Sequence, residues 1–491
     1  MPRLVDADLD RFISRLMKTR RIPGLSIGIS RKGIPLVSRG YGFRDRESML
    51  PATPRTIYGI ASLTKSFTAL CILKLEEDGR LRVTDPVTRH LPEFRTSDPR
   101  SSRKITLHHL LSHTSGLPAL PTTHYAMLRS LARDDSIDAR KLRRFGLDPD
   151  HPPLDSYEQV LDFLATARYR MLGPPGRYFC YANEAFGLLG AVIERLSGRT
   201  YESYLEEEVL RPAGMFHSTC DPGIMFRFPE VTTLYESRLK GGRARIRPSQ
   251  EWLEDSCLRS AGGLRANVED LLRYLEIYRT GGRVGSERIV GRSSVRKMLR
   301  PVIAIHPGHY YGYGLALKPD HHGYLVAYHG GGNRGVGAEI TVVPEKGITA
   351  VVLSNLGGAA SFKAAYAGIN PLLGVPMDED FFRPPQRREA PRSLREYSGW
   401  YCAGFGNWIR LTPAGDHLTA SLSSPDWNVK GVRLVPVGPD EFRARLGRDS
   451  DPVRFVRTPE GRIKGLLWVW WFHRRSSERE FRAAPRGRTV W

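Results

Sequence analysis

The feature that constrains the fold most is strand-like sequence at both ends of the region that precedes residue 355. Alternating apolar residues predict an N-terminal hairpin at residues 25–30 and 34–40, turning at Lys32 and Gly33. Three later segments also predict strands: residues 324–328, 336–343 and 348–354, the last two joined by a turn at residues 345–347. From Ser62 to about Leu275, helical periodicity dominates. We therefore predict an α/β (α+β) fold, in which one antiparallel sheet built from both ends is flanked by helices and a helical subdomain.

The sequence changes character beyond residue 382. Proline and arginine dominate residues 383–392, which predicts a linker. Residues 393–491 then show short alternating segments and hold seven of the chain's eight tryptophans, which predicts a small all-β, barrel-like domain. We expect this domain to supply no catalytic group to the main domain, residues 1–382. Within the main domain, the polar stretch Asp134–Asp155 predicts an exposed insertion.

Composition limits the class of protein. The residues Met1–Asp10 are charged, and no apolar run approaches the roughly 20 residues that span a bilayer, so we expect a soluble, cytoplasmic protein. Five widely spaced cysteines without a CxxC pair predict free thiols. The net charge of +22 comes mainly from arginines spread along the whole chain. This distribution favours a solvated surface over a specific nucleic-acid site, which would need a clustered patch.

The segment Ser62–Lys65 carries the most informative chemistry. Ser62 and Lys65 stand three residues apart at the predicted start of a helix, so their side chains lie on one face within hydrogen-bond reach. A serine hydroxyl needs a neighbouring base, and a lysine can serve when burial lowers its pKa from about 10.4 toward roughly 7 to 8. Apolar residues precede Ser62 and follow it until Asp78 and Gly79, which predicts a buried helix with a glycine C-cap.

The same spacing occurs at three other places, namely Ser101–Lys104, Ser237–Lys240 and Ser294–Lys297. The first two lie in charged, loop-like sequence, and the third opens a basic segment that is most simply a solvated helix. Only Ser62 heads a predicted buried helix. On this segment alone, a nucleophile and an ordinary helix N-cap serine are both open interpretations.

Two further segments carry polar groups suited to a reaction site. Tyr181–Asn183 is the only Tyr-x-Asn match in the chain, and it follows a glycine–proline turn and precedes helical sequence. His329–Gly331 ends a predicted strand inside a glycine cluster, where backbone N–H groups can face a ligand. His306 and His321 also match His-x-Gly but lack such a cluster. For Tyr181, a core tyrosine with a satisfied hydroxyl is the alternative.

Taken in this order, the three segments resemble the motifs of the serine beta-lactamase and penicillin-binding protein superfamily, in particular the class C-like serine hydrolases of the peptidase S12 type. The resemblance spans roughly residues 10–375 and includes framework stretches at Ile22–Gly24, Ile105–Pro118 and Ala261–Gly263. It implies a beta-lactamase/transpeptidase-like fold that needs no cofactor. By position, the terminal domain resembles the lipocalin-like β domain appended to some members.

The resemblance also implies roles for the motif residues. Ser62 would be the acylated nucleophile, and Lys65 would share its proton with Tyr181. Asn183 would hold the substrate amide, and the backbone N–H groups of Ser62 and Gly332 would form the oxyanion hole.

The third motif departs from the superfamily pattern. His329, Gly330 and Gly331 stand where beta-lactamases have Lys-Thr-Gly, a pattern that recognises a substrate carboxylate. A titratable histidine without a neighbouring hydroxyl does this less well, so we do not expect efficient beta-lactam hydrolysis. His329, Gly331 and Gly332 would still line the substrate site.

Other motifs are explained better by structure than by chemistry. Ser26 sits in a GxSxG pattern, but inside an alternating strand and not at a strand-to-helix turn. Gly330, Gly332 and Gly335 spell GxGxxG, but a strand follows where a dinucleotide site needs a helix. Three histidines, His108, His109 and His113, offer metal-ligand spacing without the HExxH glutamate, so no metal site is predicted.

The sequence therefore predicts a metal-independent serine hydrolase, of peptidase, D-aminopeptidase, amidase or esterase type, that cleaves an amide or ester through an acyl-enzyme on Ser62. One alternative is a penicillin-binding or sensor-like protein that is acylated but turns over slowly. A weaker alternative is a basic protein associated with nucleic acid. The expected partner is a small molecule or short peptide, and self-association is left open.

Overall fold

The computed structural model describes residues 2–133, 142–143, 147–240, 243–249, 252–382, 393–423, 428–446, 449–468 and 470–483. The chain forms two compact units. The first comprises residues 1–83, 186–301 and 312–381, and the second comprises residues 84–185, 302–311 and 382–491. The predicted linker, residues 383–392, lies outside the described residues, and the proposed domain limits at 382 and 393 stay a prediction.

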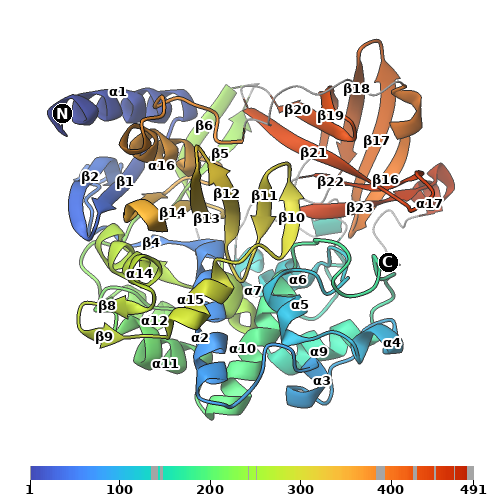
Figure 1. Cartoon of the computed structure of the whole chain (residues 1–491), viewed down its shortest axis with the longest axis horizontal. Helices are drawn as coiled ribbons and strands as arrows, with labels where there is room; N and C mark the ends of the chain where they lie inside the picture. The colour runs from blue at the N-terminus through green and yellow to red at the C-terminus, as the bar shows by residue number, and fades with distance from the viewer. Residues whose placement is uncertain are drawn as a thin grey trace. The chain divides into compact units, whose positions relative to one another are not determined.

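The first unit is built on an antiparallel sheet that joins both ends of the main region (Figure 1). Its strands follow the spatial order β12 (Ala316–His321), β13 (Tyr324–Asn333), β14 (Val336–Val343), β15 (Ile348–Ser354), β1 (Gly24–Arg31), β2 (Ile34–Asp45) and β3 (Leu50–Pro51). The early strand β1 pairs antiparallel with the late strand β15, with Ile27 opposite Val352. The predicted sheet and its N-terminal hairpin are confirmed. Lys32 and Gly33 turn the hairpin with φ of 54° and 80°.

Helices cover both faces of this sheet. A side chain added at Gly28 would contact Val268 and Leu272 of α14 (Val268–Thr280), whereas Gly368 of α16 (Ser361–Ile369) lies against Ile29. Neighbouring residues of a strand point to opposite faces, so α14 and α16 pack on opposite sides. The N-terminal helix α1 (Pro2–Arg20) also contacts α16. The sheet is therefore sandwiched between two helical layers.

The remaining elements of the first unit are mostly short. They are β4 (Tyr58–Gly59), the 3-10 turn η1 (Ala61–Leu63), α2 (Thr64–Glu77), most of α10 (Asn183–Ser197), α11 (Tyr201–Leu205), the π-helical turn η2 (Glu206–Leu210), α12 (Pro222–Met225), β5 (Tyr235–Lys240), β6 (Arg243–Pro248), η3 (Ser256–Leu258), α13 (Arg259–Gly262), β7 (Arg265–Ala266), β8 (Arg283–Val284), β9 (Glu287–Arg288), α15 (Arg292–Met298), η4 (Pro344–Lys346) and η5 (Asn370–Leu373). The hairpin of β5 and β6 interrupts a region for which the sequence predicted helices. Its strands read Tyr-Glu-Ser-Arg-Leu-Lys and Arg-Ala-Arg-Ile-Arg-Pro, an alternation of charged with uncharged residues that the helical prediction overlooked.

The second unit combines short helices, a hairpin and a barrel. Its helices are α3 (Val87–His90), α4 (Pro99–Ser102), α5 (Leu107–Leu111), α6 (Thr122–Ala126), α7 (Leu128–Ala132) and α9 (Tyr157–Thr166), and its hairpin pairs β10 (Ile303–His306) with β11 (His309–Tyr311). Much of the predicted insertion, residues 134–141 and 144–146, lies outside the described residues. In the part of the chain that is described, no helix is both long and apolar enough to cross a membrane.

The C-terminal strands close into an eight-stranded barrel, shown from orange to red in Figure 1. Consecutive neighbours pair: β16 (Gly399–Gly404), β17 (Asn407–Ala414), β18 (His417–Ser423), β19 (Asn428–Gly438), β20 (Glu441–Leu446), β21 (Asp449–Arg457), β22 (Ile463–Trp468) and β23 (Trp471–Ser476). The turn η6 (Arg395–Tyr397) precedes the barrel and α17 (Glu478–Ala483) follows it. Buried side chains such as Leu418, Ala420 and Leu422 alternate along β18 and fill the interior. The predicted small barrel is confirmed.

Strand β13 lies directly against the turn that carries Ser62. A Cβ at Gly331 would overlap the carbonyl oxygen of Ile60 and stand 2.9 Å from Leu63 Cδ1. Gly331 and His329 share a face because they are two residues apart, and His329 aligns through β14 and β15 with Gly28, which faces α14. The turn therefore packs on the α14 face of the sheet, and only glycine allows the approach.

The opposite face of β13 holds a buried carboxyl group. Gly330 pairs with Glu339, whose Oε2 stands 3.2 Å from where a Gly330 Cβ would be. The Tyr366 hydroxyl of α16 donates to Glu339 Oε1 at 3.4 Å. Burial raises the pKa of Glu339 to about 8. The space beside this glycine is thus filled by an acid that is largely protonated at neutral pH.

We expect Gly331→Ala to lower the free energy of unfolding by about 1–3 kcal/mol, because the new methyl group must push β13 away from the Ile60 carbonyl. Gly332→Ala is the matched control, since a Cβ at Gly332 meets no atom within 4 Å. Urea denaturation of the two variants measures the difference. Equal stability of both would contradict the close approach.

We expect Glu339→Gln to remove a pH dependence of stability. Because folding raises the pKa of Glu339 above its ordinary value of 4.5 to about 8, the associated stability is fully present below the lower value and is lost as the pH rises through the higher one. The wild type should lose up to roughly 1.4 kcal/mol per pH unit across this window relative to the variant. Denaturation at several pH values tests this, and parallel curves would refute it.

Candidate active site

Ser62 and Lys65 form a hydrogen-bonded pair. Lys65 is fully buried, and its Nζ donates to Ser62 Oγ at 3.1 Å and to the Ala261 carbonyl at 2.7 Å. The Phe186 ring lies 5.6 Å from the same nitrogen. The ring and the two hydrogen bonds together fix the long Lys65 side chain. The structure places the amine where it can exchange a proton with the serine hydroxyl.

The local backbone explains why Ser62 is presented in this way. The sequence predicted that Ser62 opens the helix, but α2 begins at Thr64, and Ser62 lies in the preceding 3-10 turn. Ala61 adopts a left-handed φ of 46°, a conformation that costs energy for a non-glycine residue. The Thr64 hydroxyl donates to the Ala61 carbonyl at 2.7 Å and accepts the Leu264 N–H at 3.1 Å. The surrounding chain thus holds the strained turn. At its far end, α2 stops as predicted, with Gly79 at φ 69°.

Residues behind this turn were not recognised from the sequence. Trp252 packs with Ala61, Leu234 and Val336. Asp255 is buried, and burial, with a smaller contribution from Glu254, raises its pKa to about 7, although nearby cations including Lys65 oppose the rise. A carboxyl group that changes charge near neutral pH thus lies in the electrostatic environment of Lys65. Nothing in the sequence around Asp255 predicted its burial or its raised pKa.

His329 is buried and its imidazole is neutral at physiological pH. Burial, and secondarily the charge of Lys65, lowers the pKa of His329 to about 3. Nδ1 lies 2.7 Å from the Gly330 carbonyl, so it carries the proton and donates it there. A neutral ring offers no cation for a substrate carboxylate, which agrees with the predicted departure from the Lys-Thr-Gly pattern.

The β13 segment beyond His329 presents one edge of its backbone. Strand β12 pairs with β13 only as far as Ala316 opposite Tyr328, whereas β14 remains paired up to Val336 opposite Asn333. Space is open beside Gly332, in contrast to Gly331. An edge without a strand partner leaves N–H groups for a ligand, which is the requirement for the predicted oxyanion donor at Gly332.

Tyr181 is held by its backbone within the second unit. Its N–H donates to the Trp470 carbonyl at 2.9 Å, and its carbonyl accepts from Trp471 Nε1 at 3.2 Å. Trp470 lies between β22 and β23 of the barrel, and Trp471 is the first residue of β23. Asn183 begins α10, and its Nδ2 donates to Thr123 Oγ1 at 3.0 Å.

His113 supports the Tyr181 segment. Its carbonyl accepts the Cys180 N–H at 2.9 Å, its Nδ1 accepts the Ala182 N–H at 3.1 Å, and its ring centroid lies 4.2 Å from that of Tyr181. From the sequence, His113 was interpreted as part of a framework stretch and as an improbable metal ligand. Its φ of 54° and full burial mark it instead as a positioning residue.

The other histidines of that group serve local structure. His109 Nδ1 accepts the Thr106 N–H at 3.0 Å and so caps α5, and burial lowers the pKa of His109 to about 4. Across the described ranges, no group of three or more His, Cys, Asp or Glu side chains could hold a metal ion.

The other Ser-x-x-Lys matches differ from Ser62. The Ser101 hydroxyl donates to Asp98 at 2.5 Å, and that of Ser294 donates to Glu77. Ser237 lies on strand β5 and not at a helix start. Ser26 lies inside β1 and donates to the Thr53 carbonyl at 2.7 Å.

The first unit brings together Ser62, Lys65, His329, Gly331 and Gly332, and the second brings Tyr181 close to His113 in space. The sharing of a proton between Lys65 and Tyr181 stays a prediction, as do the assigned roles of Asn183 and Gly332.

Comparisons with known proteins identify a matching family and similar sequences. A family model described as Beta-lactamase matches residues 9–370. Esterase EstB of Burkholderia gladioli is 31% identical over 294 residues, which cover 56% of this chain and 70% of the esterase. Protein flp of Staphylococcus aureus (strain NCTC 8325 / PS 47) is 30% identical over 216 residues, 43% of this chain but only 37% of its own length.

Solved structures resemble almost the whole chain. The octameric penicillin-binding protein homologue from Pyrococcus abyssi superposes with a TM-score of 0.66 at 27% identity, covering 95% of this chain and 99% of that one. SurE superposes with a TM-score of 0.70 at 23% identity, covering 96% and 99%, which shows the shared fold. With a family match over most of its length and these relatives, the chain belongs to the beta-lactamase family.

Proposed function

We propose that the protein is a serine hydrolase that cleaves an ester or amide through an acyl-enzyme on Ser62. The observation that carries the proposal is the bond between the buried Lys65 amine and Ser62 Oγ at 3.1 Å. The similarity to esterase EstB supports hydrolysis of an ester or amide.

In the proposed reaction, Ser62 Oγ attacks the substrate carbonyl carbon while its proton passes to the base formed by Lys65 and Tyr181. The negative charge that develops on the carbonyl oxygen is stabilised by the N–H groups of Ser62 and Gly332. Collapse of the tetrahedral intermediate breaks the bond to the leaving group, which takes up the proton. Water then attacks the acyl-enzyme by the same route and releases the acid.

The neutral His329 bears on substrate choice. Because its pKa is lowered to about 3, it presents no positive charge at neutral pH. We therefore propose substrates whose recognition does not depend on a carboxylate beside the scissile bond, such as simple esters or amides, and poor turnover of beta-lactams.

A second candidate is a penicillin-binding-like protein that is acylated but deacylates slowly. The similarity over nearly the full length to the Pyrococcus abyssi homologue favours it. Burst kinetics separate the two: a hydrolase continues after the burst, whereas a slow-turnover protein stops after one equivalent.

A fluorophosphonate probe should label Ser62, because it alone among the four Ser-x-x-Lys serines bonds a buried lysine in the described structure. Ser62→Ala should abolish labelling, and Ser237→Ala, on an exposed strand, should leave it unchanged. Peptide mapping identifies the site. Undiminished labelling of Ser62→Ala would contradict the assignment of Ser62 as the nucleophile.

Tyr181→Phe should lower kcat by about a hundred- to ten-thousandfold, because it keeps the ring and removes the hydroxyl that takes part in proton transfer. Lys65→Ala should be at least as damaging. Hydrolysis of a chromogenic ester, followed alongside thermal unfolding, measures both effects. If Tyr181→Phe kept most of the wild-type rate, Tyr181 would be a packing residue only.

A further inference from the structure

The backbone of Tyr181 has both of its polar groups bonded to the barrel. The Tyr181 N–H donates to the Trp470 carbonyl at 2.9 Å, and the Trp471 indole donates to the Tyr181 carbonyl at 3.2 Å. Residues 176–182 lie outside any helix or strand, so this segment has no regular hydrogen-bond ladder of its own. Its hydrogen-bond partners come instead from Trp470, which lies between β22 and β23, and from Trp471, the first residue of β23.

Side-chain packing adds to these two hydrogen bonds. The Trp470 ring centroid lies 5.6 Å from that of Tyr181, and Phe472 stacks on Tyr178 with centroids 4.1 Å apart and planes 5° from parallel. Aromatic contacts of this kind contribute beyond their buried area. The barrel therefore contacts both Tyr181, whose hydroxyl the proposed reaction uses, and Tyr178 just before it.

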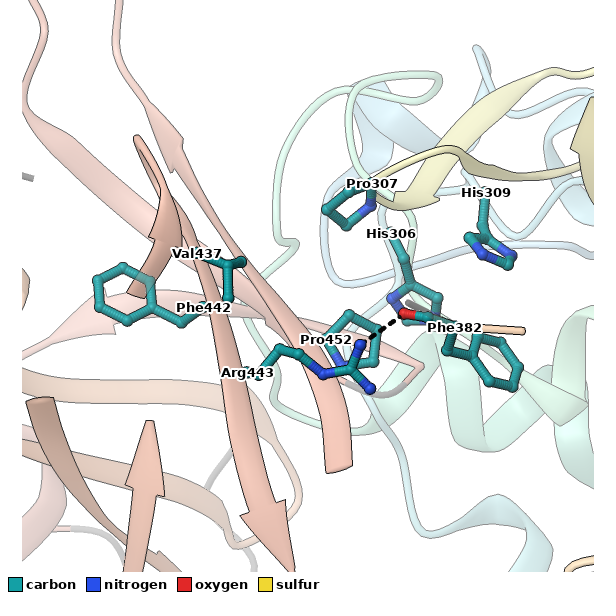
Figure 2. Close-up of a pocket in the computed structure, with 8 residues that line it drawn as sticks. All are labelled: His306, Pro307, His309, Phe382, Val437, Phe442, Arg443 and Pro452. Atoms are coloured by element: carbon teal, nitrogen blue, oxygen red, sulfur yellow. Dashed lines mark hydrogen bonds between the residues drawn. The ribbon is translucent and has the colours of Figure 1, made fainter. Parts of the chain in front are cut away.

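Within the second unit, the barrel also contacts the Ala119 segment and the hairpin of β10 and β11. The Ala119 N–H donates to the Ala403 carbonyl at 2.9 Å. Figure 2 shows a small pocket between the hairpin of β10 and β11 and the barrel, lined by His306, Pro307, His309, Phe382, Val437, Phe442, Arg443 and Pro452. In it, the Arg443 guanidinium crosses to the Phe382 carbonyl at 2.9 Å.

The same hairpin ends in Tyr311, whose ring centroid lies 5.0 Å from that of His113 and 6.5 Å from that of Tyr181. His113 in turn bonds the backbone on either side of Tyr181. The tyrosine segment is thus fixed from two directions.

We propose that the tip of the β22–β23 hairpin, formed by Trp470 and Trp471, is a positioning element for Tyr181, with Trp471 as its main side chain. The proposal rests on the proposed function, because it assigns the barrel a part in that reaction. The barrel contributes no reacting atom. It fixes the backbone from which the Tyr181 hydroxyl projects, and a displacement of about 1 Å at a reacting group can cost a hundredfold in rate.

Trp471→Phe tests the proposal, because it keeps an aromatic ring and removes the indole N–H that bonds the Tyr181 carbonyl. We expect kcat for a chromogenic ester to fall by about 5- to 50-fold, with KM changed by less than about twofold. Trp408→Phe is the matched control. Trp408 lies in the same barrel but contacts Trp400 and Phe481. It should leave kcat unchanged.

A double-mutant cycle separates positioning from general damage. If Trp471 acts through the Tyr181 hydroxyl, Trp471→Phe should have almost no further effect on the small residual rate of Tyr181→Phe. Equal losses of rate in both backgrounds would overturn the proposal while leaving Tyr181 catalytic. Full activity of Tyr181→Phe would instead remove Tyr181 from the proposed proton transfer, whereas the proposed function itself is tested separately by the labelling of Ser62.

Hydrogen exchange of the unaltered protein gives a test that needs no variant to fold. The Tyr181 amide should exchange at least about a hundredfold more slowly than an unstructured peptide, because it donates to Trp470. Exchange at the unprotected rate would mean that the hydrogen bond from Tyr181 to Trp470 does not form in solution, and the proposal would fail.

Discussion

The approach of strand β13 to the turn before α2 is the constraint on which the rest of the candidate site depends. The absence of a side chain at Gly331 lets the strand lie against the Ile60 carbonyl. One element then carries a serine and the other an open strand edge, so a carbonyl group placed between them would meet a nucleophile and hydrogen-bond donors together. The left-handed φ of Ala61 destabilises this turn, and the two hydrogen bonds of the Thr64 hydroxyl offset that strain.

Burial sets the charges around this turn. It leaves the His329 imidazole neutral and raises the pKa of Asp255 to about 7. The Lys65 amine lies within hydrogen-bond distance of the serine hydroxyl and is held by the Ala261 carbonyl on its other side. The neutral His329 supports the proposed preference for a neutral ester or amide over an anion.

Much of the architecture could be predicted from local pattern. Strands β14 and β15 were predicted with their observed limits, because a strand buried on both faces reads as a continuous apolar run between turn residues. The closed barrel followed from short alternating segments. The hairpin of β5 and β6 was missed although its charged residues recur with a period of two, because the prediction assigned the whole region between Ser62 and Leu275 mainly to helices.

The candidate site was predictable where a motif is local in sequence, and it was not where the partners are distant. Ser62 and Lys65 are three residues apart, so helical geometry alone predicts their contact. Asp255 and His113 act through tertiary contacts that a single sequence does not encode in any spacing. The two tryptophans that bond Tyr181 lie about 290 residues away from it, and their sequence pattern predicted only that they belong to a barrel.

The proposed function requires Ser62, Lys65 and Tyr181 to act together in one reaction. A crystal structure of the protein inactivated by an ester-like phosphonate tests it most directly. The account predicts phosphorus bonded to Ser62 Oγ, a phosphoryl oxygen within about 3 Å of the Ser62 and Gly332 N–H groups, and the Tyr181 hydroxyl within about 3.2 Å of Ser62 Oγ. A phosphonylated Ser62 with the Tyr181 hydroxyl turned away from it, or an adduct on another serine, would contradict the account.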